Sequence, residues 1–353
     1  MVFMKPEIEL NSVILNLIAE IDEFKGGWKY LSFLRPDALD KLRKVATIES
    51  VGSSTRIEGA RLSDAEVERL LSGLSAHSFQ SRDEEEVAGY AEAMELVFAS
   101  YNELTLTENH IRQLHSVLLK YSTKDAWHRG EYKKLPNNVE AFDPDGKALG
   151  VIFETTSPFE TPRKINDLVK WTTGTLAEKD LHPLLVIAAF VVHFLAVHPF
   201  QDGNGRLARI LTMLLLLRQG YLYVSYASLE AVIEANKESY YLALRRSQKT
   251  LYSDQYNISP WVLFFLRVLK TQKDNLGRKI GQNGSAGLMD LPPLSLQLLE
   301  LAKIEGRLTL SQAAGSIKAN ERTIRDHIQK LVKKGYLTKH GDRKATWYDV
   351  TRA

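Results

Sequence analysis

The 353-residue sequence contains no cysteine, and this absence excludes several classes of protein at once. Disulfide scaffolds, zinc fingers, iron–sulfur clusters and thiol nucleophiles all require the missing residue. Long apolar runs are absent too, because the most hydrophobic stretch, Leu184 to Val197, is interrupted by His193 and is shorter than the roughly 20 residues of a membrane span. The first residues, MVFMKPEIEL, have no apolar core typical of a signal peptide. We therefore expect a cytoplasmic protein with no membrane partner.

Glycine and proline are scarce, at 21 and 11 residues, which excludes collagen-like and low-complexity classes. Hydrophobic residues make up 44% and charged residues 25% of the chain, the balance of a folded globular protein. The net charge of +3 is unevenly spread, since residues 291–353 hold 12 basic and 6 acidic side chains against 34 and 37 in the remainder. A basic C-terminal region beside a slightly acidic body suggests an anionic partner for that region.

Apolar residues three or four positions apart predict helices in most of the chain, so the expected fold class is mainly α. The expected helices of the body cover residues 8–24, 37–50, 64–74, 83–101, 163–176, 183–197, 207–218, 227–249 and 259–272. Residues 127–159 instead carry turn signals and short β-prone pieces, which predict a hairpin-bearing loop. The expected domains are an N-terminal helical region (1–105), a core domain (106–272), a Gly- and Asn-rich linker (273–290) and a C-terminal domain (291–353).

The segment 198–209, HPFQDGNGRLAR, concentrates groups that bind phosphate and move protons. It joins an apolar helix to a following helix whose free N–H groups, with Arg206 and Arg209 on one face, form an anion site. Asp202 supplies a hard oxygen ligand suited to Mg²⁺ on phosphates. His198 is placed to accept a proton from an attacking hydroxyl. The combination indicates a site for a polyanion such as a chain of phosphates, and no Gly-Lys-Ser/Thr follows that would make it a P-loop.

Each of these features also has an ordinary structural explanation. A histidine before proline commonly marks a helix end, Asp-Gly and Asn-Gly commonly form turns, and Arg-x-x-Arg commonly lies on a solvated face. Their concentration in one short Gly-containing loop between apolar helices favours the functional interpretation.

This segment resembles the Fic family signature, His-Pro-Phe-x-Asp/Glu-Gly-Asn-Gly-Arg-x-x-Arg, at every fixed position. The resemblance extends over about residues 1–272 and includes the Leu-Thr to Leu-His pattern at 106–115, Gly130-Glu131-Tyr132, and Asn236 with Tyr240-Tyr241. It implies a Fic-type helical domain with a β-hairpin flap. It also implies a protein adenylyltransferase, which transfers AMP from ATP to a Ser, Thr or Tyr hydroxyl of a protein, including itself.

By this resemblance His198 is the catalytic base and Asp202 holds Mg²⁺ on the α- and β-phosphates. Phe200 is expected to anchor the loop in the core. Arg206 separates the chain from the Doc branch, whose motif differs there. The residues expected to bind the nucleotide are Gly203, Asn204, Gly205, Arg206, Leu207, Arg209, Tyr240 and Tyr241.

In this family the flap pairs with the backbone of the target protein. Here the sequence departs from the family's Thr-x-Gln-Asn, and Pro136, which lacks an N–H, is expected to remove one pairing bond. The residues expected at the flap are Leu135, Asn137, Asn138 and Val139.

Residues 54–59, Ser-Thr-Arg-Ile-Glu-Gly, resemble the inhibitory motif of the family, Ser/Thr-x-x-x-Glu-Gly/Asn, placed on an N-terminal helix of the same chain. Ser54, Glu58 and Gly59 are therefore expected at the ATP site. Glu58 would pair with Arg209 through a carboxylate–guanidinium contact and keep it from the γ-phosphate. The resting enzyme would then be self-inhibited. In some members this glutamate also assists removal of AMP, which the sequence leaves open.

Residues 294–350 resemble a small winged helix-turn-helix domain with short helices at 294–305, 309–316 and 321–334 and two strands around residues 340–342. An apolar face on the last helix leaves outward basic residues as candidate DNA contacts. These are Arg322, Arg325 and Lys333. Winged helices also dock proteins or form dimers, so DNA, a protein and a second copy of the chain all remain possible partners.

Two further functions remain open beside the adenylyltransferase. One is a winged-helix DNA-binding regulator whose Fic body only senses ATP. The other keeps the fold and transfers UMP or phosphate. His198 and Asp202 favour an enzyme, because a sensor needs no base.

Overall fold

The computed structural model describes residues 8–34, 36–73, 79–142, 148–251, 253–280, 291–342 and 345–351. The expected turn at 143–146 and residues 281–290 of the expected linker lie outside this part. The chain divides into two compact units. One comprises Met1–Ile21 and Leu42–Asp274, and the other comprises Asp22–Lys41 and Asn275–Ala353.

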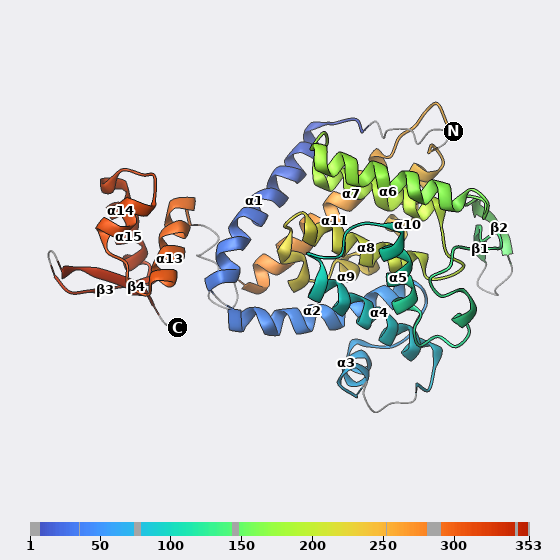
Figure 1. Ribbon diagram of the computed structural model, residues 1–353, viewed down its shortest axis with the longest axis horizontal. Coiled ribbons are helices and arrows are strands. Elements are labelled where there is room, and N and C mark those ends of the chain that lie inside the picture. The colour runs from blue at the N-terminus through green and yellow to red at the C-terminus, as the bar shows by residue number, and fades with distance from the viewer. Residues whose placement is uncertain are drawn as a thin grey trace. The chain divides into compact units, whose positions relative to one another are not determined.

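Helices dominate the structure, as the sequence predicts (Figure 1). In chain order the elements up to residue 280 are α1 (Ser12–Leu34), α2 (Pro36–Ile57), α3 (Asp64–Gly73), α4 (Arg82–Ser100), α5 (Glu108–Leu118), η1 (Ala126–His128), β1 (Val139–Phe142), β2 (Ala148–Phe153), α6 (Thr161–Glu178), α7 (Pro183–Val197), α8 (Asn204–Arg218), η2 (Leu222–Tyr226), α9 (Leu229–Ala235), α10 (Lys237–Gln248) and α11 (Ser259–Ile280). Thr107 caps α5 by accepting the His110 N–H, and Pro183 is the first residue of α7.

The core of the first unit is built around α7 and α8. Every residue from Leu184 to Val197 is buried, so α7 needs no polar face and its sequence is apolar on all sides. Helix α8 is buried from Arg206 to Leu217 and packs against α7, with α4 and α5 beside it. The segment 198–203 therefore joins two deeply buried helices, and this anchors both of its ends.

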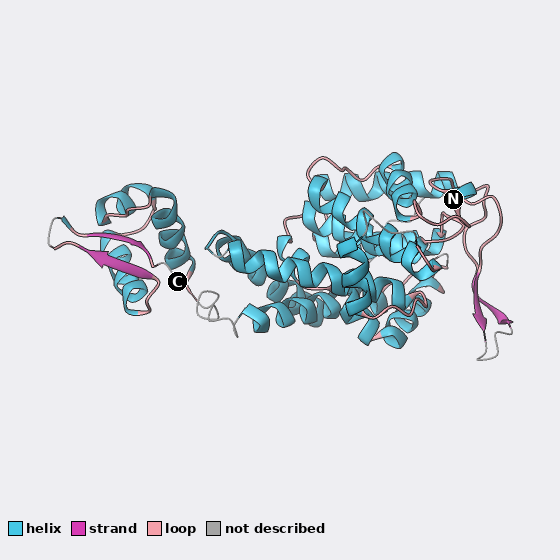
Figure 2. Ribbon diagram, turned by 90° about the horizontal axis from the view of Figure 1, so that it is seen from below, coloured by secondary structure: helices cyan, strands magenta, loops and turns pink. Residues whose placement is uncertain are grey.

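The predicted hairpin is confirmed. Strands β1 and β2 pair antiparallel, from Val139 opposite Phe153 to Phe142 opposite Ala148. The strands extend outward from the helical body (Figure 2). Pro136 lies before β1, which begins at Val139, so its missing N–H takes no part in the pairing with β2. That it removes a bond to a target backbone stays a prediction.

Two predicted helix boundaries are also wrong. The single helix expected at 227–249 is broken at Asn236, whose side-chain amide donates to the Val232 carbonyl and separates α9 from α10. Helix α11 continues to Ile280, so residues 273–280 are helical rather than linker. The polar sequence there conceals an apolar stripe, since Leu276 and Ile280 are buried like the earlier residues of the helix.

The C-terminal segment forms α13 (Pro293–Glu305), α14 (Leu310–Ser316), α15 (Glu321–Lys333) and an antiparallel pair, β3 (Leu337–His340) and β4 (Trp347–Val350). A capping box between Thr309 and Gln312 starts α14. Helix α13 packs against α15 and β4, and α14 packs against α15. Arg343 lies outside the described residues. In the part of the chain that the structure describes, no helix has both the length and the apolarity to cross a bilayer.

Candidate nucleotide-binding site

The segment between α7 and α8 has a fixed, unusual backbone. His198 ends α7 with φ of 52°, and Gly203 precedes α8 with φ of 78°, both in the left-handed region. Asn204 fixes the turn, since its Oδ1 accepts the Phe200 N–H at 2.9 Å and its Nδ2 donates to the Phe200 carbonyl at 2.7 Å. No side chain caps α8, so the N–H groups at its start are open to a ligand. The side chain of Asn204 thus holds the turn, while its backbone N–H lies at the open start of the helix.

A buried histidine, His115, packs against this turn. The ring of His115 stacks on the ring of Phe200, with the two ring centroids 3.8 Å apart. Phe200 is fully buried, as predicted. The Gly130 N–H donates to His115 Nδ1 at 2.9 Å, so Nε2 must carry the proton and donate to the Asp202 carbonyl at 3.0 Å. Burial lowers the pKa of His115 to about 4, which keeps the ring neutral and this tautomer fixed.

His198 has the protonation state that a base requires. Its Nδ1 lies 3.2 Å from the Leu195 carbonyl, and because a carbonyl only accepts, Nδ1 carries the proton. Nε2 then holds a free lone pair. Burial lowers the pKa of His198 to about 4, so the ring is neutral near pH 7.

Asp202 and Arg206 belong to a ring of four alternating charges. Arg206 Nη1 lies 3.0 Å from Glu86 and its Nη2 lies 3.5 Å from Asp202. Arg82 joins the same two carboxylates, at 2.7 Å from Glu86 and 3.0 Å from Asp202. Burial alone would raise the pKa of Asp202, but Arg206, the Gly203 N–H and Arg82 outweigh it and lower that pKa, so the carboxylate stays ionised.

Glu58 and Arg209 meet as the sequence predicts. Helix α2 ends at Ile57. The next residue is Glu58, and its Oε1 lies 2.8 Å from Arg209 Nη2. Ser54 holds the same guanidinium from α2, because its hydroxyl accepts from Nε at 2.8 Å and its carbonyl accepts from Nη2 at 2.9 Å. Burial alone would lower the pKa of Arg209. The neighbouring Glu58 carboxylate and other groups outweigh this effect and raise the pKa, so the guanidinium stays protonated.

The carboxylate of Glu58 also covers the open start of α8. A Cβ added at Gly205 would lie only 2.2 Å from Glu58 Oε1, so the glycine lets this carboxylate come close to the backbone of α8. The Nη1 of Arg209 lies 3.4 Å from the same Cβ position, is buried, and has no hydrogen-bond partner among the described residues. A guanidinium donor left unused beside a helix N-terminus fits an anion that would take the place of the Glu58 carboxylate.

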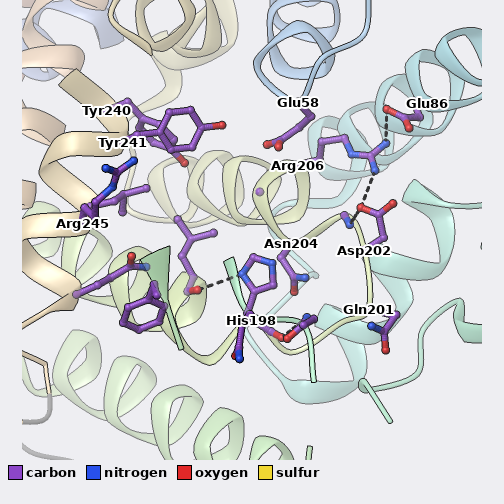
Figure 3. A pocket seen from close by; sticks show the side chains of 18 of the residues that line it. Glu58, Glu86, His198, Gln201, Asp202, Asn204, Arg206, Tyr240, Tyr241 and Arg245 are labelled. Carbon is purple, nitrogen blue, oxygen red and sulfur yellow. Dashed lines mark hydrogen bonds and ion pairs between the residues drawn. The ribbon is translucent and has the colours of Figure 1, made fainter. Parts of the chain in front are cut away.

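One cavity of about 620 Å³, a volume suited to a nucleotide, is lined by Glu58, His198, Asp202, Gly205 and Arg206. Figure 3 shows Tyr240, Tyr241 and Arg245 at one side of the cavity and Asp202 with Arg206 at the other. Glu58 and His198 lie between these two sides. Tyr240 is 4% exposed and packs against Trp261 and Phe264, whereas Tyr241 is 37% exposed. The cavity thus has an aromatic side suited to a base and a charged side suited to phosphates.

The flap residues are not equivalent. Leu135 is 59% exposed and free to meet a target protein. Asn137 instead turns inward and donates to the carbonyls of the catalytic segment, while Asn138 accepts the Thr155 N–H at 3.0 Å. Val139 begins β1. Leu135 and Asn138 are both exposed, whereas Asn137 is half-buried and held against residues 198–200.

The donor set around Asp202 fits Mg²⁺ only as part of a metal–nucleotide complex. Among the described residues no cluster of three or more His, Asp or Glu side chains could hold a metal alone. Asp202 offers a single ionised carboxylate beside a phosphate site, and Mg²⁺ commonly combines one or two carboxylates with substrate phosphates and water.

Sequence reasoning missed several residues at this site. Arg82 and Glu86 complete the charge ring, and Arg245 and Gln248 line the aromatic side. Their i, i+4 and i, i+3 spacings are ordinary for exposed helix faces, so the sequence held no signal that set them apart. His115 lay within a quoted motif, yet nothing in the sequence indicated its contact with the Asp202 carbonyl.

Residues 105–216, which contribute much of the lining of this cavity, match the model of the Fic/DOC family. The matched segment runs from just before α5 into α8 and includes all of residues 198–209. This match agrees with the resemblance of residues 198–209 to the Fic signature.

The sequence is 30% identical over 187 residues to the protein adenylyltransferase Fic of Drosophila willistoni, covering 52% of this chain and 34% of the fly protein. The corresponding Drosophila melanogaster protein is 28% identical over 186 residues, covering 52% of this chain and 35% of the relative. The chain thus spans about a third of the length of these curated relatives.

Two solved structures share the fold. A Fic family protein from Desulfovibrio desulfuricans superimposes with a TM-score of 0.64 over 99% of both chains at 21% identity. A Fic domain containing signaling protein from Bacteroides thetaiotaomicron gives a TM-score of 0.58 at 26% identity, over 74% of this chain and 96% of that one.

Proposed function

We propose that this protein transfers AMP from ATP to a hydroxyl group of a protein, with His198 as the base. The observation that carries the proposal is the contact between His198 Nδ1 and the Leu195 carbonyl, from which the tautomer of the ring follows. Its Nδ1 proton is bound to the Leu195 carbonyl and its Nε2 is free, in a cavity that also holds Asp202 and the open start of α8. A protein that only sensed ATP would need no such base.

The chemistry follows from this arrangement. The attacking hydroxyl gives its proton to His198 Nε2 as its oxygen forms a bond to the α-phosphorus. The bond from that phosphorus to the bridging oxygen breaks, and pyrophosphate leaves. The N–H groups at the start of α8 and Arg206 stabilise the charge on the phosphates, while Asp202 would hold Mg²⁺, which neutralises phosphate charge when bound.

We further propose that the resting protein is inhibited by Glu58. Its carboxylate lies over Gly205 and pairs with Arg209, so it occupies the place and the partner that a terminal phosphate requires. Removing Glu58 would leave Arg209 held by Ser54 and Nη1 still directed at the phosphate site. The same carboxylate is the candidate for a role in AMP removal, which incubation of the modified protein with wild-type protein would test.

Intact mass measurement of the Glu58→Gly variant after incubation with Mg·ATP tests the proposed activity. The expected product carries one adenylyl group on the protein itself or on an added protein. A phosphoryl mass would assign a kinase-like reaction, and no mass change would contradict the enzyme. Parallel incubation with UTP distinguishes adenylyl from uridylyl transfer.

For the C-terminal segment we propose a winged helix that binds DNA. Ile324, Ile328 and Leu331 of α15 are buried, which turns the basic residues of this helix to its exposed side. These are Arg322, Arg325 and Lys333. A helix-turn-helix followed by a two-stranded wing commonly places such a helix in the major groove.

A further inference from the structure

Lys133 is a buried lysine beside the catalytic segment that the proposed reaction does not use. It is 3% exposed, and its ammonium donates to Asn137 Oδ1 at 2.7 Å, to Thr155 Oγ1 at 2.9 Å and to the Val197 carbonyl at 3.0 Å. An ammonium has three N–H donors and no acceptor, so these bonds use its full capacity. None of the three acceptors carries a formal charge.

This burial has an energetic cost that packing does not explain. Removing an ammonium from water disfavours its charged form, and burial lowers the pKa of Lys133 to about 8. An apolar side chain of similar size would fill the space without this cost. The carbonyl of Val197 lies at the negative end of the α7 dipole, which offsets part of the cost. The charge is therefore better explained by what it orients.

The group that it orients is the amide of Asn137. Because the ammonium can only donate, the amide oxygen must face it, and the amide nitrogen must face the other way. Thr155 reinforces this choice by donating to the same oxygen at 2.9 Å. The nitrogen of Asn137 then donates to the Phe200 carbonyl at 2.6 Å and to the His198 carbonyl at 3.2 Å.

These two carbonyls belong to the most constrained part of the site. His198 holds a left-handed backbone conformation that non-glycine residues rarely adopt, so surrounding contacts must maintain it. The backbone N–H of Lys133 also donates to the Pro199 carbonyl at 2.8 Å. Three successive carbonyls, of His198, Pro199 and Phe200, are thus held from one stem of the flap, and a shift of this segment would redirect His198 Nε2.

We propose that Lys133 is a positioning residue for the proposed transfer, which fixes the amide of Asn137 and through it the aim of the His198 imidazole. This inference rests on the proposed function. Thr155 follows β2 and Asn137 precedes β1, so the same ammonium also joins both stems of the flap to the end of α7.

The test compares Lys133→Met with Lys134→Met, a matched control at the exposed neighbouring position, both in the Glu58→Gly background. Intact mass gives the rate of self-modification at saturating Mg·ATP, and calorimetry gives the affinity for a non-hydrolysable ATP analogue. We expect Lys133→Met to lower the saturated rate at least about tenfold with analogue affinity within about threefold, as small misplacements of reacting groups do. Lys134→Met should change neither.

An unchanged saturated rate would overturn the positioning role, and so would a joint loss of rate and affinity, which marks a general structural role. If Lys133→Met fails to fold, Asn137→Asp decides the question, because aspartate keeps an oxygen toward Lys133 but places an acceptor against the two carbonyls. We expect its thermal unfolding midpoint to match that of the parent and its rate to fall; full activity would refute the proposal. An inactive Glu58→Gly parent would refute the proposed function itself, whereas an active parent with an equally active Lys133→Met variant refutes only the positioning role.

Discussion

The start of α8 and the exposed side of α15 both present arginines, yet their charges lie in opposite surroundings. Arg206 and Arg209 are 2% and 3% exposed, and each pairs with a carboxylate from a distant part of the chain. The side chain of Arg325 is 54% exposed and pairs with Glu321 one turn away on its own helix. A buried ion pair fixes the geometry of its side chains, and removing one partner costs much folding free energy. An exposed ion pair contributes little folding free energy. We therefore expect large, specific effects at α8 and small, additive ones at α15.

The largest effect is expected from His198→Ala in the Glu58→Gly background. Loss of a general base lowers rates by about 10²- to 10⁴-fold, and the saturated rate of transfer should fall within this range. The affinity for a non-hydrolysable ATP analogue should stay nearly constant, because Asp202, Arg206 and the start of α8 remain. Single-turnover mass measurements with calorimetry check both quantities. Full activity of this variant would contradict the role of His198 as the base.

The next effect is activation by Glu58→Gly in the otherwise wild-type chain. A hydrogen bond to a charged group contributes about 1.5–3 kcal/mol, so the rate of self-modification should rise by about 10- to 100-fold. Glu58→Gln keeps the shape but removes the charge and is expected to give an intermediate rise. Equal or lower rates in both variants would contradict self-inhibition through Arg209.

Acid should destabilise the buried region in a predictable direction. Burial lowers the pKa values of His115, His193 and His198 to about 4, against about 6.5 in the unfolded chain. Between these values the unfolded state binds more protons, so the free energy of unfolding falls as pH drops, by about 1.4 kcal/mol per pH unit for each imidazole. Denaturant unfolding at about pH 7, 5.5 and 4.5 measures this slope. His193→Gln should make it shallower, and an unaltered slope would exclude a contribution from that ring.

The smallest effects are expected at α15. Single alanine substitutions of Arg322, Arg325 and Lys333 should each weaken binding to random duplex DNA a few-fold and lower the salt slope by about 1 per phosphate contact. Mobility shifts at two salt concentrations measure this, with Lys303→Ala on α13 as a control. If the wild-type chain does not bind DNA at low salt, the proposed DNA binding is wrong, and a protein partner is the alternative for the C-terminal segment. A loss confined to one DNA sequence would contradict phosphate contact and indicate base recognition.

The sequence predicted more about the catalytic segment than about its surroundings. The segment, its flanking helices and the Glu58–Arg209 pair are local patterns or short motifs, and all three are found in the structure. The boundary errors at Asn236 and beyond residue 272 arise because a side-chain hydrogen bond and a sparse apolar stripe decide where those helices end. The inward turn of Asn137 was not predictable, since its partners lie more than sixty residues away.

By itself the sequence determined the helical fold class, the hairpin and the chemical inventory of the site, because helix periodicity, turn residues and a dense local motif are encoded within a few turns of chain. Only the tertiary structure decided that Arg82 and Glu86 join Asp202 and Arg206 in a charge ring, and which donors stay free. Arg82 reaches Asp202 across 120 residues, and such a contact depends on how buried helices pack rather than on any local pattern.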